Sequence, residues 1–408
     1  MIYRNIFLFF IIIAGCLSFS YAAIHLSQKS NDIRGYGANF TNMPSNSIDG
    51  TPSLSTTKLS EETRKSNAMQ IALLLDTSGS MAGLIEQAKS QLWNILNELA
   101  KTTKGEELPT LEIALYEYGN PSNSTGKYQI HQLSPFTTDM DLVSEKLFSL
   151  RTNGGEEYCG AVIKASIDEL DWTTKGGLKM IYIAGNEPFT QGPIGYRKIC
   201  KTAQNQGIIV NTIYCNDNAT YDVRSWKLGA EAGGGEFFTI NHNETTAYVE
   251  TPYDDEINQL NQELNKTYHS FNSYGEGKVQ NLHLQDSNAS SYSKENAAKR
   301  TKFKASKQYK TSDWDLVENY QKDKTILEKA TIKDERLSKM SKVELEDEIE
   351  HMAQKREEVK QKINALDKKR VAYKKDKIKT DQKNNLGNSI IKTVRKQAKK
   401  KGYKVEEN

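Results

Sequence analysis

A run of six residues, Gln70 to Leu75, constrains the fold of this chain more than any other segment. Five of the six are apolar, and an unbroken apolar run is typical of a strand that is buried on both faces of a parallel sheet. The run ends in Asp76-Thr77-Ser78-Gly79-Ser80, and apolar residues at helical spacing follow from Leu84 to Leu99. The sequence therefore predicts a buried strand, a polar turn and an amphipathic helix in direct succession.

Strand-like and helical segments continue to alternate after this helix. Further strands are predicted at 111–118, 178–184, 208–215 and 236–240, with helices at 139–150, 158–170, 196–206 and 223–231. A last helix, at 254–268, is expected to close the domain. This alternation predicts an α/β fold with a doubly wound, mostly parallel sheet that helices cover on both faces.

The polar turn after the first strand is the strongest candidate for a functional site. In open α/β sheets, ligands bind in the crevice at the carboxyl ends of the strands, where this turn is expected to lie. The carboxylate of Asp76 and the hydroxyls of Ser78 and Ser80 could converge on a hard cation, because such cations prefer oxygen ligands. The alternative is that these three side chains only cap the helix that follows.

The turn and the order of elements over residues 70–271 resemble von Willebrand factor A (VWA) domains and their metal ion-dependent adhesion site (MIDAS). The resemblance implies a Rossmann-like fold with Asp76, Ser78 and Ser80 as metal ligands. It also implies a protein partner whose acidic side chain completes the coordination. The sequences of the loops as a whole, such as Ala184-Gly185-Asn186-Glu187-Pro188, resemble those of bacterial envelope-associated VWA proteins.

The other two metal loops depart from the family pattern. Where the family has a threonine, two glutamates follow Gly154-Gly155, and the third loop carries no aspartate. Glu156 and Glu187 are the candidate replacements, and the alternatives are Thr152, Glu157 and Asn186. The resemblance makes Mg²⁺ the first choice of divalent cation, whereas added carboxylates would favour Ca²⁺ or Mn²⁺. If the site is degenerate, it holds no cation.

The first 22 residues are interpreted as a signal peptide. Arg4 supplies a positive charge, Ile6 to Gly15 is an apolar run, and Ser20-Tyr21-Ala22 is a small-residue cleavage site. We therefore expect export to the periplasm or cell envelope of a bacterium. An alternative is a lipobox that ends at Cys16, where lipidation would anchor the chain. Residues 23–67 are polar and are expected to form a disordered spacer.

Three cysteines remain after the signal peptide. Cys159 lies in the second loop and Cys215 ends a strand, so both are expected at the same edge of the sheet, and a disulfide between them is predicted. Cys200 is interpreted as a buried thiol. A nucleophilic Cys159 with His131 or His242 as its base is the enzyme alternative. We expect no catalysis, because no histidine stands in a recognisable hydrolase context and no phosphate-binding loop is present.

Charge divides the chain into two unlike parts. Residues 1–290 carry 22 basic against 32 acidic side chains, whereas 291–408 carry 33 against 20. The sequence predicts a VWA domain at 68–274, a polar linker at 275–311 and a basic helical, partly coiled-coil extension at 312–408. From Leu345 to Tyr373, apolar residues and two arginines alternate at spacings of four and three, which is a heptad seam.

The expected function is protein binding or scaffolding in the cell envelope through the metal loop. The basic tail could also contact an anionic membrane or cell-wall polymer, and the seam could mediate self-association. Export argues against nucleic acid as the partner. The alternative is a structural or stress-related envelope protein that acts through its helical arm without a functional metal site.

Overall fold

The computed structural model describes residues 67–122, 128–173, 176–216, 222–244, 248–377 and 385–405. The predicted signal peptide, the lipobox at Cys16 and almost all of the predicted spacer lie outside these residues. Among the described helices, none combines the length and the apolar character that crossing a membrane requires.

A six-stranded sheet organises the chain, in the order β4-β3-β1-β5-β6-β7. All neighbouring strands are parallel except β3 and β4. The strands are β1 (Ala68–Asp76), β3 (Thr110–Tyr118), β4 (Ile130–Thr137), β5 (Leu178–Gly185), β6 (Ile208–Cys215) and β7 (Gly234–Ile240). The fold class and the five strands predicted from the sequence are therefore confirmed.

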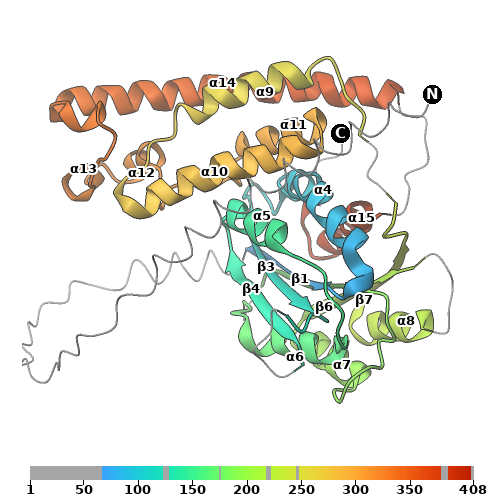
Figure 1. Cartoon of the computed structure of the whole chain (residues 1–408). Coiled ribbons are helices and arrows are strands. Elements are labelled where there is room, and N and C mark those ends of the chain that lie inside the picture. Colours follow the sequence, from blue (N-terminus) through green and yellow to red (C-terminus); the bar gives the residue numbers. More distant parts are fainter. Residues whose placement is uncertain are drawn as a thin grey trace, which may run out of the picture. The chain divides into compact units, whose positions relative to one another are not determined.

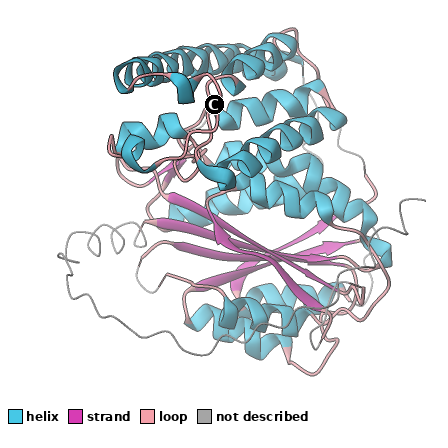
Figure 2. Cartoon of the chain, turned by 60° about the vertical axis from the view of Figure 1, so that its left-hand side comes forward, coloured by secondary structure: helices cyan, strands magenta, loops and turns pink. Residues whose placement is uncertain are grey.

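Helices cover both faces of the sheet, as Figure 2 shows. One face packs against α4 (Ala82–Leu99), α5 (Met140–Ser149) and α15 (Leu386–Lys400). The other packs against α6 (Cys159–Glu169), α7 (Tyr196–Asn205) and α8 (Val223–Ala232). Side chains of β1 alternate between the two layers: Ile71 and Leu75 face the first, and Ala72 and Leu74 face the second. Burial on both sides explains why the β1 run is apolar throughout.

The antiparallel strand β4 was not predicted. It lies at the edge of the sheet and contains Pro135, a residue that strands tolerate only at edges or bulges. Its pairing with β3 is interrupted by register shifts on either side of Leu115. A second, two-stranded sheet joins β2 (Thr102–Thr103) to β8 (Lys404–Val405).

The prediction of a polar linker at 275–311 is wrong. This region is mostly helical, with α10 (Asn272–Tyr292) and α11 (Lys294–Lys304). Apolar residues at helical spacing are scarce in this region because α11 buries charged side chains. Arg300 donates to Asp141 at 2.6 Å and to Asp286 at 2.5 Å, so its burial is compensated by ion pairs rather than by apolar neighbours.

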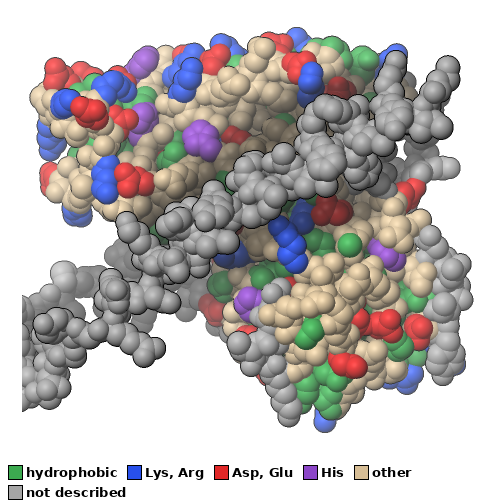
Figure 3. Space-filling view, viewed as in Figure 1, with side chains coloured by type: hydrophobic (Ala, Val, Ile, Leu, Met, Phe, Trp, Pro, Cys, Tyr) green, Lys and Arg blue, Asp and Glu red, His purple; other side chains and the backbone are tan. Residues whose placement is uncertain are grey.

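The heptad seam lies on α14 (Lys342–Lys377), which packs against α9 (Asp254–Asn265), α11 and α12 (Leu316–Lys322) of the same chain (Figure 1). Its two arginines are buried: Arg356 binds Asp315, and Arg370 binds Asp254. The seam is thus occupied within the chain and is not free to pair with a second copy. Figure 3 shows acidic and basic side chains mixed on the outer surface of this helical layer, so it is not uniformly basic.

The helix expected to close the VWA domain comes from a different part of the chain. The last predicted helix, α9, packs in the layer of α11 and α14, away from the sheet. Instead α15 covers the sheet beside α4, with Leu386, Ile390 and Val394 buried. The sheet domain therefore combines residues 68–240 with 385–405, and the predicted boundary at 274 is replaced by a helical insertion.

Candidate functional site

Asp76 ends β1 at the carboxyl edge of the sheet, and its side chain is fully buried. One carboxylate oxygen, Oδ1, accepts a hydrogen bond from the backbone N–H of Ser78 at 2.7 Å. The other, Oδ2, has no hydrogen-bond partner among the described residues. A buried carboxylate oxygen without a partner is costly, so the turn leaves an acceptor available for a ligand.

Burial raises the pKa of Asp76 from its ordinary value of 3.8 to about 7. The hydrogen bonds from Ser78 oppose this shift, and the negative charge of Glu187 adds to it. The nearby backbone N–H of Asn186 also opposes the shift, although it does not reach hydrogen-bonding geometry. Near neutral pH the carboxylate is thus poised between its protonated and ionised forms, and a neighbouring cation would favour the ionised form.

The two serines of the turn lie together and cap neither of the helices that follow them. The hydroxyls of Ser78 and Ser80 are 3.4 Å apart, with Ser78 buried and Ser80 exposed. Ser78 precedes a short 3-10 helix without making a side-chain cap, and α4 begins after Met81 without one. Helix capping, the alternative explanation for these residues, is therefore not what their side chains do.

In the third loop, Asn186 takes part in the site more directly than Glu187 does. The Asn186 amide donates to the Ser80 hydroxyl at 3.1 Å. Glu187 is half-buried, and its backbone carbonyl accepts from the Trp226 indole at 2.9 Å. Its carboxylate influences the site through its charge on Asp76. Of the two alternatives that the sequence left open, the structure brings Asn186 into contact with the turn.

In the second loop, the Glu157 side chain belongs to the site and the Glu156 side chain lies outside it. Glu156 is exposed, whereas Glu157 is buried and its Oε2 has no hydrogen-bond partner among the described residues. A β-carbon built at Gly119 would lie 2.9 Å from Asp76 Oδ1 and 2.9 Å from Glu157 Cγ. The side chains of Asp76 and Glu157 therefore both pack against this glycine. The sequence could not separate two adjacent glutamates in a loop.

A buried acidic residue that the sequence interpretation missed, Glu117, supports the turn from β3. Its carboxylate accepts from the Thr77 hydroxyl at 3.2 Å and lies 3.1 Å from Nδ1 of His131. The Thr77 carbonyl in turn accepts from the backbone N–H of Asn153 in the second loop at 3.0 Å. The signal was present, because Glu117 is a charged residue in a strand whose other residues are mostly apolar.

The donors that meet at this edge are oxygens: two carboxylates, two hydroxyls and an amide. The described residues contain no group of three or more histidine, cysteine or acidic side chains placed to hold a metal ion. A site built from Asp76, Glu157 and the serine hydroxyls has a different composition, which suits a hard cation such as Mg²⁺ or Ca²⁺. The orphaned oxygens of Asp76 and Glu157 fit such an ion.

The predicted disulfide between Cys159 and Cys215 is wrong, because both are free thiols. They pack on opposite faces of the sheet, Cys159 with α6 and α7, and Cys215 with the α4 layer. Cys159 donates to the Tyr118 hydroxyl at 3.8 Å. Burial raises the pKa of the Cys159 thiol well above its ordinary value, so the thiolate needed for nucleophilic attack is scarce at neutral pH.

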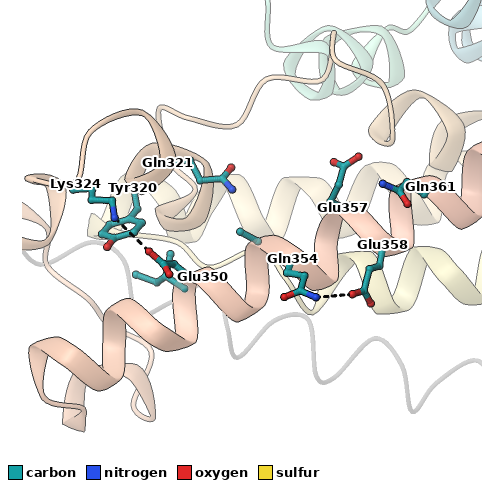
Figure 4. A pocket seen from close by; sticks show the side chains of 10 residues that line it. Tyr320, Gln321, Lys324, Glu350, Gln354, Glu357, Glu358 and Gln361 are labelled. Carbon is teal, nitrogen blue, oxygen red and sulfur yellow. Dashed lines mark hydrogen bonds and ion pairs between the residues drawn. The ribbon is translucent and has the colours of Figure 1, made fainter.

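A hollow of about 740 Å³ lies between α12 and α14 (Figure 4). Its polar side chains pair with one another: Lys324 contacts Glu350 at 3.3 Å, and Gln354 donates to Glu358 at 3.0 Å. No orphaned buried oxygen is recorded among its lining residues in the described part of the chain. This hollow therefore carries less evidence for a ligand than the loop edge does.

No protein-family model and no curated protein matches the sequence. Solved structures of VWA domains are similar to it. The conserved hypothetical protein BatB from Bacteroides thetaiotaomicron is 14% identical, with a TM-score of 0.33, and the match covers 54% of this chain and 100% of that one.

Two further structures show the range of proteins with this likeness. A von Willebrand factor type A protein from Catenulispora acidiphila is 13% identical, with a TM-score of 0.33 over 43% of this chain and 39% of that one. Proximal thread matrix protein 1 from the mussel byssus, solved with a zinc-occupied MIDAS motif, is 10% identical, with a TM-score of 0.33 over 43% and 42%. At these identities the likeness concerns the fold.

Proposed function

We propose that this chain is an exported VWA-type module that binds a protein partner in the cell envelope through a divalent cation at the loop edge. One observation carries the proposal: Asp76 Oδ2 and Glu157 Oε2 are buried without hydrogen-bond partners among the described residues. Burying two ionised carboxylates together costs several kcal/mol unless a cation or proton compensates them. A divalent cation would supply that compensation.

The residues that would hold the cation are Asp76, Ser78, Ser80 and Glu157, with Asn186 beside them. The cation would act as a Lewis acid that accepts an oxygen from the partner. Because Glu157 brings a second carboxylate, the ion's charge is balanced within the chain, and this favours Ca²⁺ or Mn²⁺ as alternatives to Mg²⁺. Glu156 and Glu187 are not needed as ligands in this proposal.

Calorimetric titration of Mg²⁺, Ca²⁺ and Mn²⁺ into the full-length protein tests the site. We expect at least one ion to bind below about 1 mM, as extracellular oxygen-ligand sites do, and Asp76→Asn to abolish that binding. The matched control is Asp168→Asn, an exposed position on α6. Absence of binding by all three ions in the wild-type protein would overturn the metal site.

Capture of envelope proteins with and without a chelator tests the role in binding. We expect a partner that is retained by the wild-type chain, released by the chelator and not retained by Asp76→Asn. The competing function, a structural envelope protein that acts through its helices, is favoured by the raised pKa of Asp76, because a proton can replace the cation there. A partner that is unaffected by chelation and by Asp76→Asn would favour it.

Export is part of the proposal and has its own test. It rests on Arg4, the apolar run from Ile6 to Gly15, and the cleavage site before Ala23. N-terminal sequencing of the mature protein should begin near residue 23, whereas a lipidated Cys16 would support the anchored alternative. An uncleaved N-terminus in a bacterial host would contradict both.

A further inference from the structure

The outer face of α14 is acidic in its first half and basic in its second half. Between residues 342 and 358, five of its exposed side chains are acidic and one is a lysine. Between 359 and 377, the exposed charged side chains that the structure describes are all lysines. The acidic half carries Glu344, Asp347, Glu350, Glu357 and Glu358 beside Lys342, and the basic half carries Lys362, Lys368, Lys369, Lys375 and Lys377.

The sequence gives the same contrast when every residue is counted, including those that the structure does not describe. Residues 342–358 contain three lysines and arginines and seven acidic residues. Residues 368–384 contain eight lysines and arginines and two acidic residues, Asp376 and Asp381. The two ends of the helix therefore have opposite net charges, whichever way the following residues turn.

This face lies opposite the heptad seam, which is buried against α9, α11 and α12. Figure 1 shows α14 along the outer side of the helical layer. The helix dipole favours acidic residues in the first turn and basic residues in the last turn, but it acts over about one turn only. Glu357 is the sixteenth residue of α14, so it stands about four turns from the start of the helix. The dipole therefore does not account for the extent of the two charged halves.

The acidic half borders the hollow between α12 and α14, where Figure 4 shows its side chains. Glu350 contacts Lys324 there at 3.3 Å, and Glu357 is exposed beside them. The basic half presents the small side chains of Ala365 and Ala372 between its lysines, so a second helix can approach it closely. The hollow beside one half and the slim surface of the other half are thus complementary in shape as well as in charge.

We propose that α14 pairs with α14 of a second copy of this chain in antiparallel orientation, the acidic half of each copy against the basic half of the other. A two-fold interface needs a surface that is complementary to itself, and a helix with opposite charges in its two halves is so only when the copies are antiparallel. Asp347 and Lys375 are each 14 residues from Gln361. In a pair centred on Gln361, Asp347 of one copy therefore lies opposite Lys375 of the other. A partner of uniform charge would be repelled by one of the halves, which is why a second copy is the occupant that we favour.

The pairing should be weak, sensitive to salt and independent of the metal loop. Exposed ion pairs each contribute little, and salt screens them within about 10 Å at 0.1 M. α14 packs on other helices, whereas the turn at Asp76 ends a strand of the sheet. The dimer does not need the cation, so the two proposals can fail separately.

Sedimentation equilibrium of the full-length protein in EDTA tests for the dimer. We expect a monomer–dimer equilibrium whose dissociation constant rises at least about 10-fold between roughly 0.05 M and 0.5 M NaCl. Asp76→Asn should dimerise as the wild-type chain does, whether or not the metal site proves real. A wild-type chain that stays monomeric at low salt, or a dimer that salt does not affect, would overturn the proposal.

Reversal of charge in one half at a time tests the antiparallel arrangement. Asp347→Lys with Glu357→Lys makes both halves basic, and Lys368→Glu with Lys375→Glu makes both acidic. Each substitution acts twice in a two-fold dimer, so four contacts change from attraction to repulsion, and we expect each variant alone to dimerise at least about 30-fold more weakly. The two variants mixed should form a heterodimer, because their halves then attract each other again.

The mixture separates lost pairing from lost folding, since misfolded variants would not rescue each other. Lys198→Glu with Lys201→Glu is the matched control, because it reverses equal charge at exposed positions on α7, and it should dimerise as the wild-type chain does. If the reversed variants still dimerise alone, the second copy binds through another surface. If their mixture stays monomeric, the antiparallel pairing of α14 is wrong.

Discussion

The side chains of Asp76 and Glu157 both pack against Gly119: Asp76 Oδ1 and Glu157 Cγ each lie 2.9 Å from the point where a β-carbon at position 119 would stand. The glycine has φ +78, a backbone conformation that side chains rarely adopt. Gly119, which directly follows β3, therefore contributes space to the site rather than a ligand. The side chains of Asp76 and Glu157 that pack against it are the basis of the predictions about the loop edge.

Glu157→Gln should weaken divalent-cation binding, whereas Glu156→Gln should not. The substitution removes one buried carboxylate but keeps its shape, and a charged ligand in a partly buried site is worth about 1.5–3 kcal/mol, or roughly 10- to 150-fold in affinity. Calorimetry on both variants measures the difference. Equal affinities would show that Glu157 is not the ligand that distinguishes the pair, and a weaker Glu156→Gln would show that the exposed glutamate is the ligand.

Gly119→Ala should disrupt the loop edge, and Gly105→Ala should be milder. Both glycines have positive φ, so both alanines carry a backbone strain of about 1–2 kcal/mol. A β-carbon at Gly105 meets nothing within 4 Å, whereas at Gly119 it meets the Asp76 carboxylate and the side-chain methylene of Glu157. We therefore expect Gly119→Ala to lose cation binding and to be less stable than Gly105→Ala in urea unfolding. Similar results for the two would mean that the carboxylates move apart freely.

The stability of the cation-free protein should carry a pH dependence that originates at Asp76. Its pKa is about 7 in the folded chain and near 3.8 when unfolded, so between these values the folded state binds more protons. Its contribution is fully present below about pH 4 and is lost as the pH rises to about 7. The loss is on the order of 4 kcal/mol.

Urea unfolding in EDTA at pH 5 and pH 8 isolates this contribution when Asp76→Asn is compared with the wild type. The asparagine cannot ionise, so the variant should gain stability relative to the wild type on going from pH 5 to pH 8. A saturating divalent cation should close the gap at pH 8 by stabilising the ionised wild-type carboxylate. A constant difference between the two proteins at both pH values would contradict the raised pKa.

The sheet was predictable because its central strands are buried on both faces. Runs such as Ile208–Cys215 must be apolar in such a position, and this signal needs no knowledge of the neighbours. The position of the polar turn at Asp76 was predictable for a related reason, since Asp76 follows an apolar strand directly. β4 was not predicted, because an edge strand needs no unbroken apolar run and tolerates a proline such as Pro135.

The helical insertion could not be predicted from hydropathy because its interior contains many charges. Lys304 is fully buried, yet it is surrounded by the oxygens of Asn261, Asn265 and Asp286. Side chains of this type appear in a sequence as a polar linker, and only their partners show that they are buried. The choice between Glu156 and Glu157 failed for a similar reason, because loops have no periodicity that indicates which side chain points inward.

Arg356→Met should destabilise the chain far more than Lys355→Met. Arg356 on α14 donates to Asp315 at 2.5 and 3.1 Å and is 6% exposed. Removing it leaves Asp315 buried and uncompensated, which costs about 3–5 kcal/mol. Lys355 is half-buried, with 43% of its side chain exposed, and contacts Glu263 at 3.3 Å, so its loss should cost within about 0.5 kcal/mol. Urea unfolding compares them, and equal costs would mean that Asp315 finds another partner.

Ile390→Ala and Ile391→Ala should show that the C-terminal helix is part of the sheet domain. Ile390 is 2% exposed and lines a cavity of about 20 Å³ between α4, α15 and the sheet, beside Leu73 and Tyr182. Its neighbour Ile391 is only partly buried. Shortening Ile390 should cost about 2–5 kcal/mol, because the transfer of the side chain is lost and the existing cavity grows.

The size and the location of that loss both carry information. If α15 completes the sheet, Ile390→Ala should lower the stability of the whole cooperative unit, including protection of β5 and β6 amides from hydrogen exchange. Ile391→Ala should cost less, because less of its surface is buried. If instead α15 were a loosely attached tail, both variants would unfold at the wild-type urea concentration and exchange in the central strands would be unchanged. The basic end of the chain would then be free of the domain.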